Sequence, residues 1–98
     1  MGERLARWFL DDHGLRVVAK NIRVDRGEID ILALDRGEKV AIEVRTITGE
    51  GEPIDAVDPA KRRRVHGLAR QAGAKRVDFV GVRLGADAVV FHWVPGGV

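Results

Sequence analysis

The sequence contains no cysteine, no tyrosine, one methionine and three prolines in 98 residues. Without cysteine there is no disulfide framework and no thiolate-bound zinc or iron–sulfur site, so we expect a core-stabilised fold in a reducing cytoplasm. No apolar run approaches the ~20 residues that cross a bilayer, and the first residues lack the apolar stretch of a secretory signal. We therefore expect a cytoplasmic chain without a membrane segment.

The residues that are present indicate one folded domain over residues 1–98, with a frayed tail at 95–98. Apolar residues make up 45% of the sequence and charged residues 33%, a composition typical of globular rather than disordered proteins. A chain of this length buries only roughly 60–65% of the surface of its unfolded form. That leaves room for a single core.

Charge is unevenly distributed along the chain, although the net charge is only +2. Residues 25–58 carry ten acidic and four basic side chains, whereas residues 59–77 carry seven basic side chains and no acidic one. An enzyme that acts on a polyanion needs bases that attract phosphates beside acids that hold a metal ion. A solvated helix face would give the same pattern, so charge alone leaves both interpretations open.

Hydrophobic periodicity predicts the order α-β-β-β-α-β-β, which is an α/β fold with a mixed central sheet flanked by two helices. The first helix is expected over residues 2–13 and ends at Gly14, while Asp58 and Pro59 begin a second helix that runs to Gly73. Strands are expected over 15–24, 29–34, 40–47, 77–84 and 88–94. The short segment 35–38 predicts a tight hairpin turn.

The hairpin turn determines which side chains face each other. With Arg36 and Gly37 at the turn, Asp30 lies opposite Glu43 and Arg45 lies opposite Glu28. The same register collects apolar side chains on one face of the hairpin, whereas a slip by one residue would mix the two faces. On that face Ile29, Ile31 and Ala33 lie opposite Val44, Ile42 and Val40.

The facing pair of Asp30 and Glu43 is a candidate metal site. Opposed residues have Cβ atoms ~5 Å apart, and two carboxylates at that distance repel by roughly 3 kcal/mol. A divalent cation between them would offset the repulsion, and hard oxygen ligands suit Mg²⁺ or Mn²⁺. A solvated face neutralised by neighbouring charges such as Arg45 and Lys39, or a proton on one acid, would offset it equally well.

Lys61 lies within the apolar stripe of the second predicted helix, where a fully solvated lysine is not expected. It can reach along the sheet to the carboxylates, or extend past the edge of the core into water. Three arginines, Arg62, Arg63 and Arg70, occupy the neighbouring flank with His66 and are expected to face outward. Trp8 and Trp93 are expected in the core or at its edge.

Several short motifs carry a family resemblance. They are Gly2-Glu3 with Ala6, Phe9, Leu10 and Gly14, then Asn21 and Arg23, Gly27-Glu28-Ile29-Asp30, Glu43-Val44-Arg45, Lys61 with Ala69, and Arg76-Val77-Asp78. In order and approximate spacing they resemble the YraN-like family of small bacterial proteins over residues 2–93. That family belongs to the PD-(D/E)xK nuclease superfamily and is similar to archaeal Holliday-junction resolvases.

The resemblance implies roles for individual residues. Asp30 and Glu43 would be the metal-binding acids, the Val44 carbonyl a third ligand, and Glu3 an additional acid in the active site. The final lysine of the motif falls on Arg45, whose guanidinium can position a phosphate but cannot act as a base. Lys61 is the residue best placed to compensate.

Three functions are consistent with these residues. The first is a Mg²⁺- or Mn²⁺-dependent endonuclease that acts on branched or structured DNA, with Arg45 and Lys61 at the scissile phosphate and Arg62, Arg63 and Arg70 on the backbone. The second is a nuclease fold that binds nucleic acid without cleaving it, which the arginine at position 45 favours. The third is a module whose basic helix meets an acidic protein. The resemblance also implies a homodimer as one option, because resolvase-like enzymes usually act as two-fold dimers.

Overall fold

The computed structural model describes residues 2–24, 27–48 and 59–97, with the backbone alone at residues 2, 3, 47 and 48. Its elements follow the predicted order: α1 (Gly2–Asp12), β1 (Arg16–Val24), β2 (Gly27–Asp35), β3 (Glu38–Thr48), α2 (Pro59–Gln71), β4 (Arg76–Leu84) and β5 (Val89–Val94). The expected cap at Asp58 lies outside the described residues. Within the described parts of the chain, neither helix has the length and apolar character needed to cross a membrane.

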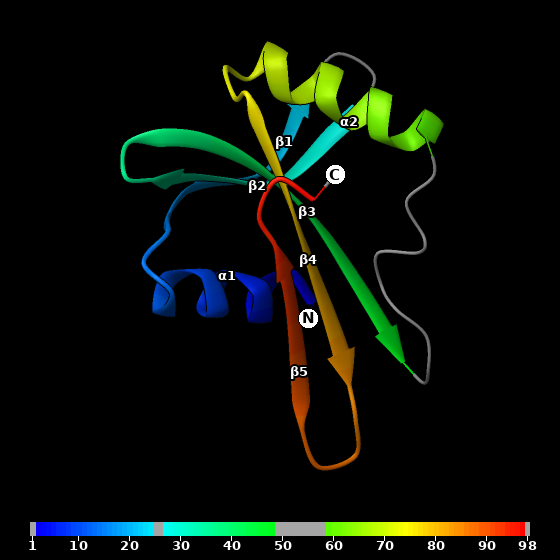
Figure 1. Cartoon of the computed structure of the whole chain (residues 1–98). Helices are drawn as coiled ribbons and strands as arrows, with labels where there is room; N and C mark the ends of the chain where they lie inside the picture. Colours follow the sequence, from blue (N-terminus) through cyan, green and yellow to red (C-terminus); the bar gives the residue numbers. More distant parts are fainter. Residues whose placement is uncertain (1, 25–26, 49–58, 98) are drawn as a thin grey trace.

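The five strands form one mixed sheet in the order β1-β2-β3-β4-β5. β3 and β4 are parallel, and the other neighbours are antiparallel. A parallel pair needs a long crossover connection, and the connection from β3 to β4 contains α2. The helices α1 and α2 lie on opposite sides of the sheet (Figure 1). The chain is therefore a small three-layered α/β domain, as the periodicity predicts.

Each face of the sheet has its own hydrophobic core, so the expectation of a single core is wrong. Ala6 and Leu10 of α1 are fully buried against one face, together with Ile31, Val40, Ile42, Val80 and Val82. Val65 and Ala69 of α2 bury against the other face with Leu32, Ala41, Val77 and Phe79. Apolar residues at helical spacing thus give each helix one buried stripe, which holds it to the sheet.

Ile29 is an exception to the expected hairpin face. It packs in the α2 cluster instead of joining Ile31 and Ala33 in the α1 cluster. The start of β2 runs close beneath α2, because a Cβ atom added at Gly27 would lie only 2.5 Å from a methyl carbon of Leu68. This close approach draws the first residues of β2 into the second core.

The hairpin turn forms where it was predicted. Arg36 and Gly37 have φ angles of 53° and 84°, and two successive positive angles are typical of the two-residue turns whose twist matches that of the strands. The turn sets the predicted register, with Leu34 opposite Lys39 and Ile31 opposite Ile42.

The hairpin ladder ends earlier than the sequence predicts. Its last pair is Ile31 with Ile42, after which β3 continues only beside β4. The expected pairs of Asp30 with Glu43 and of Arg45 with Glu28 both fall beyond this last pair, so neither forms as a ladder pair. Beyond it, β2 continues beside β1 and β3 continues beside β4.

Candidate functional site

Asp30 occupies the point at which β2 and β3 separate. Its Oδ2 atom accepts a hydrogen bond of 2.8 Å from the backbone N–H of Val44. The side chain therefore takes the place of a strand-to-strand hydrogen bond just beyond the last ladder pair. This contact fixes the half-buried carboxylate beside the backbone of Val44, next to Glu43.

Glu43 forms an ion pair with Lys61 on the α2 face of the sheet. Lys61 Nζ lies 2.9 Å from Glu43 Oε1, and the two side chains are only 20% and 13% exposed. The prediction that Lys61 reaches toward the carboxylates is confirmed. A charge-assisted hydrogen bond shielded from water to this degree is stronger than one between exposed groups. The first turn of α2 is thereby held over β3.

Together Asp30, Glu43 and Lys61 form what we call the carboxylate site. Two carboxylates and the nearby Val44 carbonyl are hard oxygen donors, which suit Mg²⁺ or Mn²⁺. Among the described residues, no group of three or more histidine and acidic side chains is placed to hold a metal ion. Two carboxylates and one carbonyl would leave the remaining coordination positions of a cation such as Mg²⁺ to water.

The remaining predicted site residues are distributed around this point. Arg45 is two residues beyond Glu43, so strand alternation directs it to the same face, where it is half-buried. Glu3 lies within α1, and its side chain is outside the described residues. The catalytic and metal-binding roles of these residues stay predictions.

The three arginines expected on the outer flank of α2 gather around one groove. Arg62, Arg63 and Arg70 line a depression of about 470 Å³ together with His66 and Gly67. All three arginines are exposed, as the helical wheel predicts. Guanidinium groups arranged this way can each contact a phosphate of a polyanion.

Asn21 adds a feature that the sequence analysis missed. Its φ angle is 53°, although it lies inside β1, and no ladder pair forms at this residue. The flanking pairs, Lys20 with Ile31 and Ile22 with Ile29, place Asn21 beside Asp30. Asparagine tolerates this left-handed conformation better than most residues. The available signals were its place among the family motifs and an asparagine in an otherwise β-rich run.

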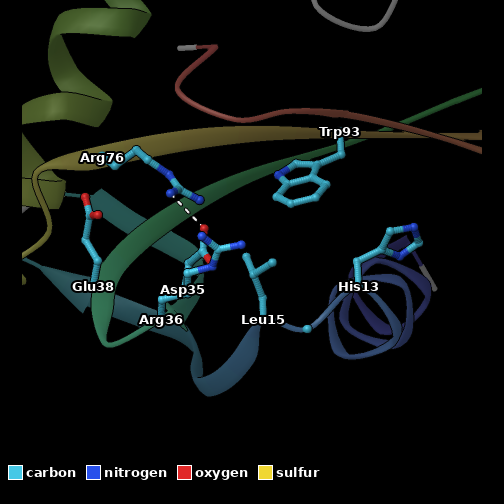
Figure 2. Close-up of a pocket in the computed structure, with 8 residues that line it drawn as sticks. His13, Leu15, Asp35, Arg36, Glu38, Arg76 and Trp93 are labelled. Atoms are coloured by element: carbon cyan, nitrogen blue, oxygen red, sulfur yellow. Dashed lines mark ion pairs between the residues drawn. The ribbon is translucent and has the colours of Figure 1, made fainter.

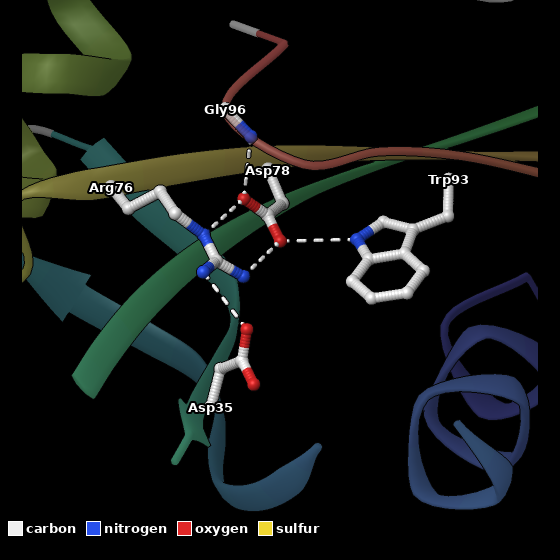
Figure 3. A network of polar contacts seen from close by, with 5 residues as sticks. All are labelled: Asp35, Arg76, Asp78, Trp93 and Gly96. Carbon is white, nitrogen blue, oxygen red and sulfur yellow. Dashed lines mark hydrogen bonds and ion pairs between the residues drawn. The ribbon is translucent and has the colours of Figure 1, made fainter. Parts of the chain in front are cut away.

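A second polar cluster lies on the α1 face and is built around Asp78, which is completely buried (Figure 3). Arg76 donates to both carboxylate oxygens over 2.8 and 2.9 Å. Trp93 Nε1 donates to Oδ2 at 3.0 Å, and the backbone N–H of Gly96 donates to Oδ1 at 2.8 Å. Four donors thus satisfy a buried charge that would otherwise be very costly.

This cluster connects three segments of the chain. Arg76 also pairs with Asp35 at the hairpin turn, over 2.9 Å. The hydrogen bonds to Asp78 raise the pKa of Arg76 above its ordinary value, with a further contribution from Asp35. The sequence predicts a frayed tail at residues 95–98, but the N–H of Gly96 bonds to Asp78 of β4. The described part of this segment is therefore held to the sheet. Val98 lies outside the described residues.

A cavity of about 640 Å³ opens beside the pair of Arg76 and Asp35 (Figure 2). Its charged lining includes Glu38 and Arg36 as well, so two carboxylates face two guanidinium groups. With opposite charges balanced in this way, the cavity favours neither an anion nor a cation. We regard it as part of the structural cluster and not as a functional site.

The sequence matches known proteins across most of its length. Residues 2–82 match the family described as "Uncharacterised protein family UPF0102". The chain belongs to this family. UPF0102 is the YraN-like family whose motifs the sequence resembles, so that prediction is confirmed.

Individual UPF0102 proteins are similar over nearly the whole domain. The chain is 43% identical to a UPF0102 protein of Paenarthrobacter aurescens over 91 residues, which cover 83% of this chain and 75% of the relative. It is 41% identical to one of Symbiobacterium thermophilum over 96 residues, covering 88% and 81% of the two chains. A Mycolicibacterium vanbaalenii relative is 43% identical over 99 residues, covering 91% and 82%.

Proposed function

We propose that this UPF0102 protein is a metal-dependent DNA endonuclease that hydrolyses phosphodiester bonds, with branched or structured DNA as its substrate. One observation carries the proposal: Lys61 reaches from α2 to within 2.9 Å of Glu43, beside the carboxylate of Asp30. Two acids and a lysine, partly shielded from water at the end of a hairpin ladder, are a combination that phosphate chemistry uses. A purely structural pair would not require the second acid.

Each residue of the carboxylate site has a role in this proposal. Asp30 and Glu43 hold the cation together with the Val44 carbonyl, and Asp30 is kept in place by the N–H of Val44. When bound, a divalent cation supplies positive charge to the phosphate and lowers the pKa of the attacking water. Glu3 of α1 is the additional acid that the resemblance implies.

Lys61 and Arg45 contribute charge at the scissile phosphate. The ion pair with Glu43 holds the Lys61 ammonium group at the carboxylate site, where its positive charge attracts a phosphate oxygen. Arg45 is permanently charged and cannot remove a proton, so it binds phosphate or stabilises the charge of the transition state. Arg62, Arg63 and Arg70 bind the DNA backbone along the groove of α2.

Cleavage of labelled DNA tests the proposal directly. We expect the wild type to cut four-way, duplex or single-stranded DNA in the presence of Mg²⁺ or Mn²⁺, and Asp30→Asn and Glu43→Gln to lose nearly all activity. Lys61→Ala should lower the rate by roughly 10²- to 10⁴-fold if the lysine assists proton transfer. Glu38→Gln, at the exposed turn of the same hairpin, is the control and should cut like the wild type. Activity that persists in both Asp30→Asn and Glu43→Gln would refute the site.

A second candidate function is DNA binding without cleavage. It is favoured by Arg45, because the corresponding lysine of the superfamily motif can orient or deprotonate water and a guanidinium cannot deprotonate it. The variant Arg45→Lys separates the two functions. If cleavage is metal-driven, its rate should stay within about tenfold of the wild type. If the wild type is inert and Arg45→Lys cleaves DNA, the chain is a binding protein on a nuclease scaffold.

A further inference from the structure

β5 forms one edge of the sheet, and in the described parts of the chain no strand lies beyond it. Its six residues, Val89–Val94, include no lysine, arginine, aspartate, glutamate or proline. In an antiparallel pair, alternate residues bond to the partner strand and the others direct their N–H and C=O groups away from it. The outer side of β5 therefore presents an uncharged strand for pairing, although at its end the Val94 carbonyl already accepts a hydrogen bond of 3.0 Å from the Gly97 N–H.

The opposite edge of the sheet shows how this protein protects a strand. β1 carries three exposed basic side chains, Arg16, Lys20 and Arg23. It also has an irregularity in its ladder between Val17 and Ala19, and a left-handed residue at Asn21. Charges and irregular backbone of this kind discourage pairing with another chain. β5 has none of these features among its residues.

The surface beside β5 is apolar as well. Trp8 of α1 was expected in the core or at its edge, but it is 60% exposed, and Val89 and Val90 are 42% and 52% exposed. Trp8 reaches only the rim of the core, where its ring centroid lies 6.0 Å from that of Phe91. A groove of about 600 Å³ runs between α1 and β5, lined by Leu5, Trp8, Phe9, His13, Val89 and Phe91. The tip of the β4–β5 hairpin projects past α1, on the side away from α2 (Figure 1).

We propose that this face binds a second copy of the chain, with the two β5 strands paired antiparallel about a two-fold axis. Such pairing would join the sheets of two copies into one of ten strands. Self-pairing of six-residue strands gives about six hydrogen bonds between the chains. It also brings the apolar grooves of the two copies to the same axis, where Trp8 and Phe91 can be covered.

The charge pattern favours a second copy over a different partner. In a two-fold interface residue i meets residue j and j meets i, so charges near the axis would face their own copies and repel each other. β5 is free of formal charge and its groove is apolar, whereas the basic residues are on β1 and α2. A partner recognised by charge would bind those elements instead.

The proposed pairing has a consequence for the carboxylate site that rests on the proposed function. A two-fold axis normal to the sheet keeps equivalent faces on the same side, so both α2 helices and both Glu43 side chains would share one face. β3 lies two strands in from β5. With neighbouring strands ~4.8 Å apart, the two sites would be roughly 24 Å apart across the sheet. One DNA molecule could then contact both basic grooves.

Sedimentation of the protein without DNA or metal tests the dimer separately from any nuclease activity. We expect the wild type to shift from monomer to dimer as its concentration rises. Val90→Lys places a charge on the exposed β5 edge and should raise the dissociation constant by at least about tenfold. Val18→Lys is the matched control, because Val18 is an exposed valine on the opposite edge strand. It should leave the dissociation constant unchanged.

Two outcomes would overturn the proposal. A wild type that stays monomeric at the highest soluble concentration would exclude the dimer, and equal weakening by Val90→Lys and Val18→Lys would exclude the β5 edge. Circular dichroism establishes whether each variant is folded. Hydrogen exchange on the wild type needs no variant: amides of β5 should become more protected in concentrated than in dilute solution, while amides of β1 should not change. Unchanged protection of β5 would contradict the pairing.

Discussion

Lys61 Nζ lies 2.9 Å from Glu43 Oε1, and this ion pair joins the first turn of α2 to the third strand of the sheet. In the absence of a cation, the ammonium group offsets part of the repulsion between Glu43 and the neighbouring Asp30. A metal ion bound by the two carboxylates would have the same effect. Under the proposed function, Lys61 and the metal would compete for Glu43, and this competition can be measured.

The first prediction concerns the response of stability to Mn²⁺. Free Mn²⁺ at ten times its dissociation constant should stabilise the wild type by about 1.4 kcal/mol, which raises Tm by roughly 6–11 °C. Glu43→Gln should abolish most of this rise, because it removes one anionic ligand. Lys61→Met should start from a lower Tm and show a larger rise, because no ammonium group competes with the cation. Thermal unfolding followed by circular dichroism measures all three.

Glu38→Gln is the matched control for Glu43→Gln, since both remove one carboxylate from β3. It should show the same response to Mn²⁺ as the wild type. If Mn²⁺ raised the Tm of Glu43→Gln and Glu38→Gln equally, metal binding at the carboxylate site would be excluded.

The second prediction concerns the basic groove of α2. Replacing Arg62, Arg63 and Arg70 by alanine should weaken the binding of unrelated DNA sequences about equally. The slope of log K against log salt should fall by roughly 0.9 for each phosphate that the protein no longer neutralises. The triple variant of Arg16, Lys20 and Arg23 removes the same charge from exposed positions on β1 and should change binding much less. Fluorescence anisotropy with labelled DNA measures both slopes.

If the wild type binds no DNA even at ~50 mM salt, where electrostatic attraction is strongest, the nucleic-acid functions fail. The exposed arginines of α2 would then be better explained by an acidic protein partner.

The third prediction concerns the buried carboxylate of Asp78. Asp78→Asn should destabilise the protein by about 3 kcal/mol or more, because it leaves Arg76 facing an amide and directs an N–H group toward existing donors. Asp35→Asn should cost only about 1 kcal/mol or less, since Asp35 is 26% exposed and makes one contact with Arg76. Urea denaturation gives both values. If the two variants lost similar free energies of unfolding, the buried carboxylate of Asp78 would contribute no more to stability than that of Asp35.

The fourth prediction concerns the left-handed backbone at Asn21. Asn21→Gly should leave stability unchanged or raise it by up to about 1 kcal/mol, because glycine adopts φ 53° without steric cost. Asn21→Val should lower stability by about 1–2 kcal/mol. Lys20→Gly is the control in ordinary strand conformation, where glycine should destabilise by roughly 0.5–1 kcal/mol. A destabilising Asn21→Gly would mean that the asparagine side chain, and not the backbone, matters here.

The hairpin could be predicted from the sequence because its determinants are local. The turn at Arg36 and Gly37 and the alternation of apolar residues on either side fix the register without reference to the rest of the chain. Lys61 could be placed for a similar reason, since the helical period alone puts it on the side of α2 that faces the sheet. These two local patterns were enough to bring Glu43 and Lys61 together.

The features that could not be predicted depend on distant segments. The hairpin ladder ends at Ile31 and Ile42, while β2 continues beside β1 and β3 beside β4, and no local pattern reveals this end point. The burial of Asp78 depends on donors from Trp93 and Gly96, which follow it by 15 and 18 residues. An acid inside the apolar run from Val77 to Val82 was the one available sign that Asp78 is buried.

The parallel pairing of β3 with β4 also has a consequence for how the protein folds. The paired residues Val40 and Arg76 are 36 positions apart in the sequence, whereas the other strand pairs are joined by short connections. Ladders that close long stretches of chain form more slowly than hairpins. We therefore expect the β1–β2–β3 and β4–β5 segments to gain structure first. Because Lys61 belongs to the segment that closes last, the pair of Glu43 and Lys61 should form late in folding. In stopped-flow experiments, Lys61→Met should speed unfolding and leave the folding rate nearly unchanged.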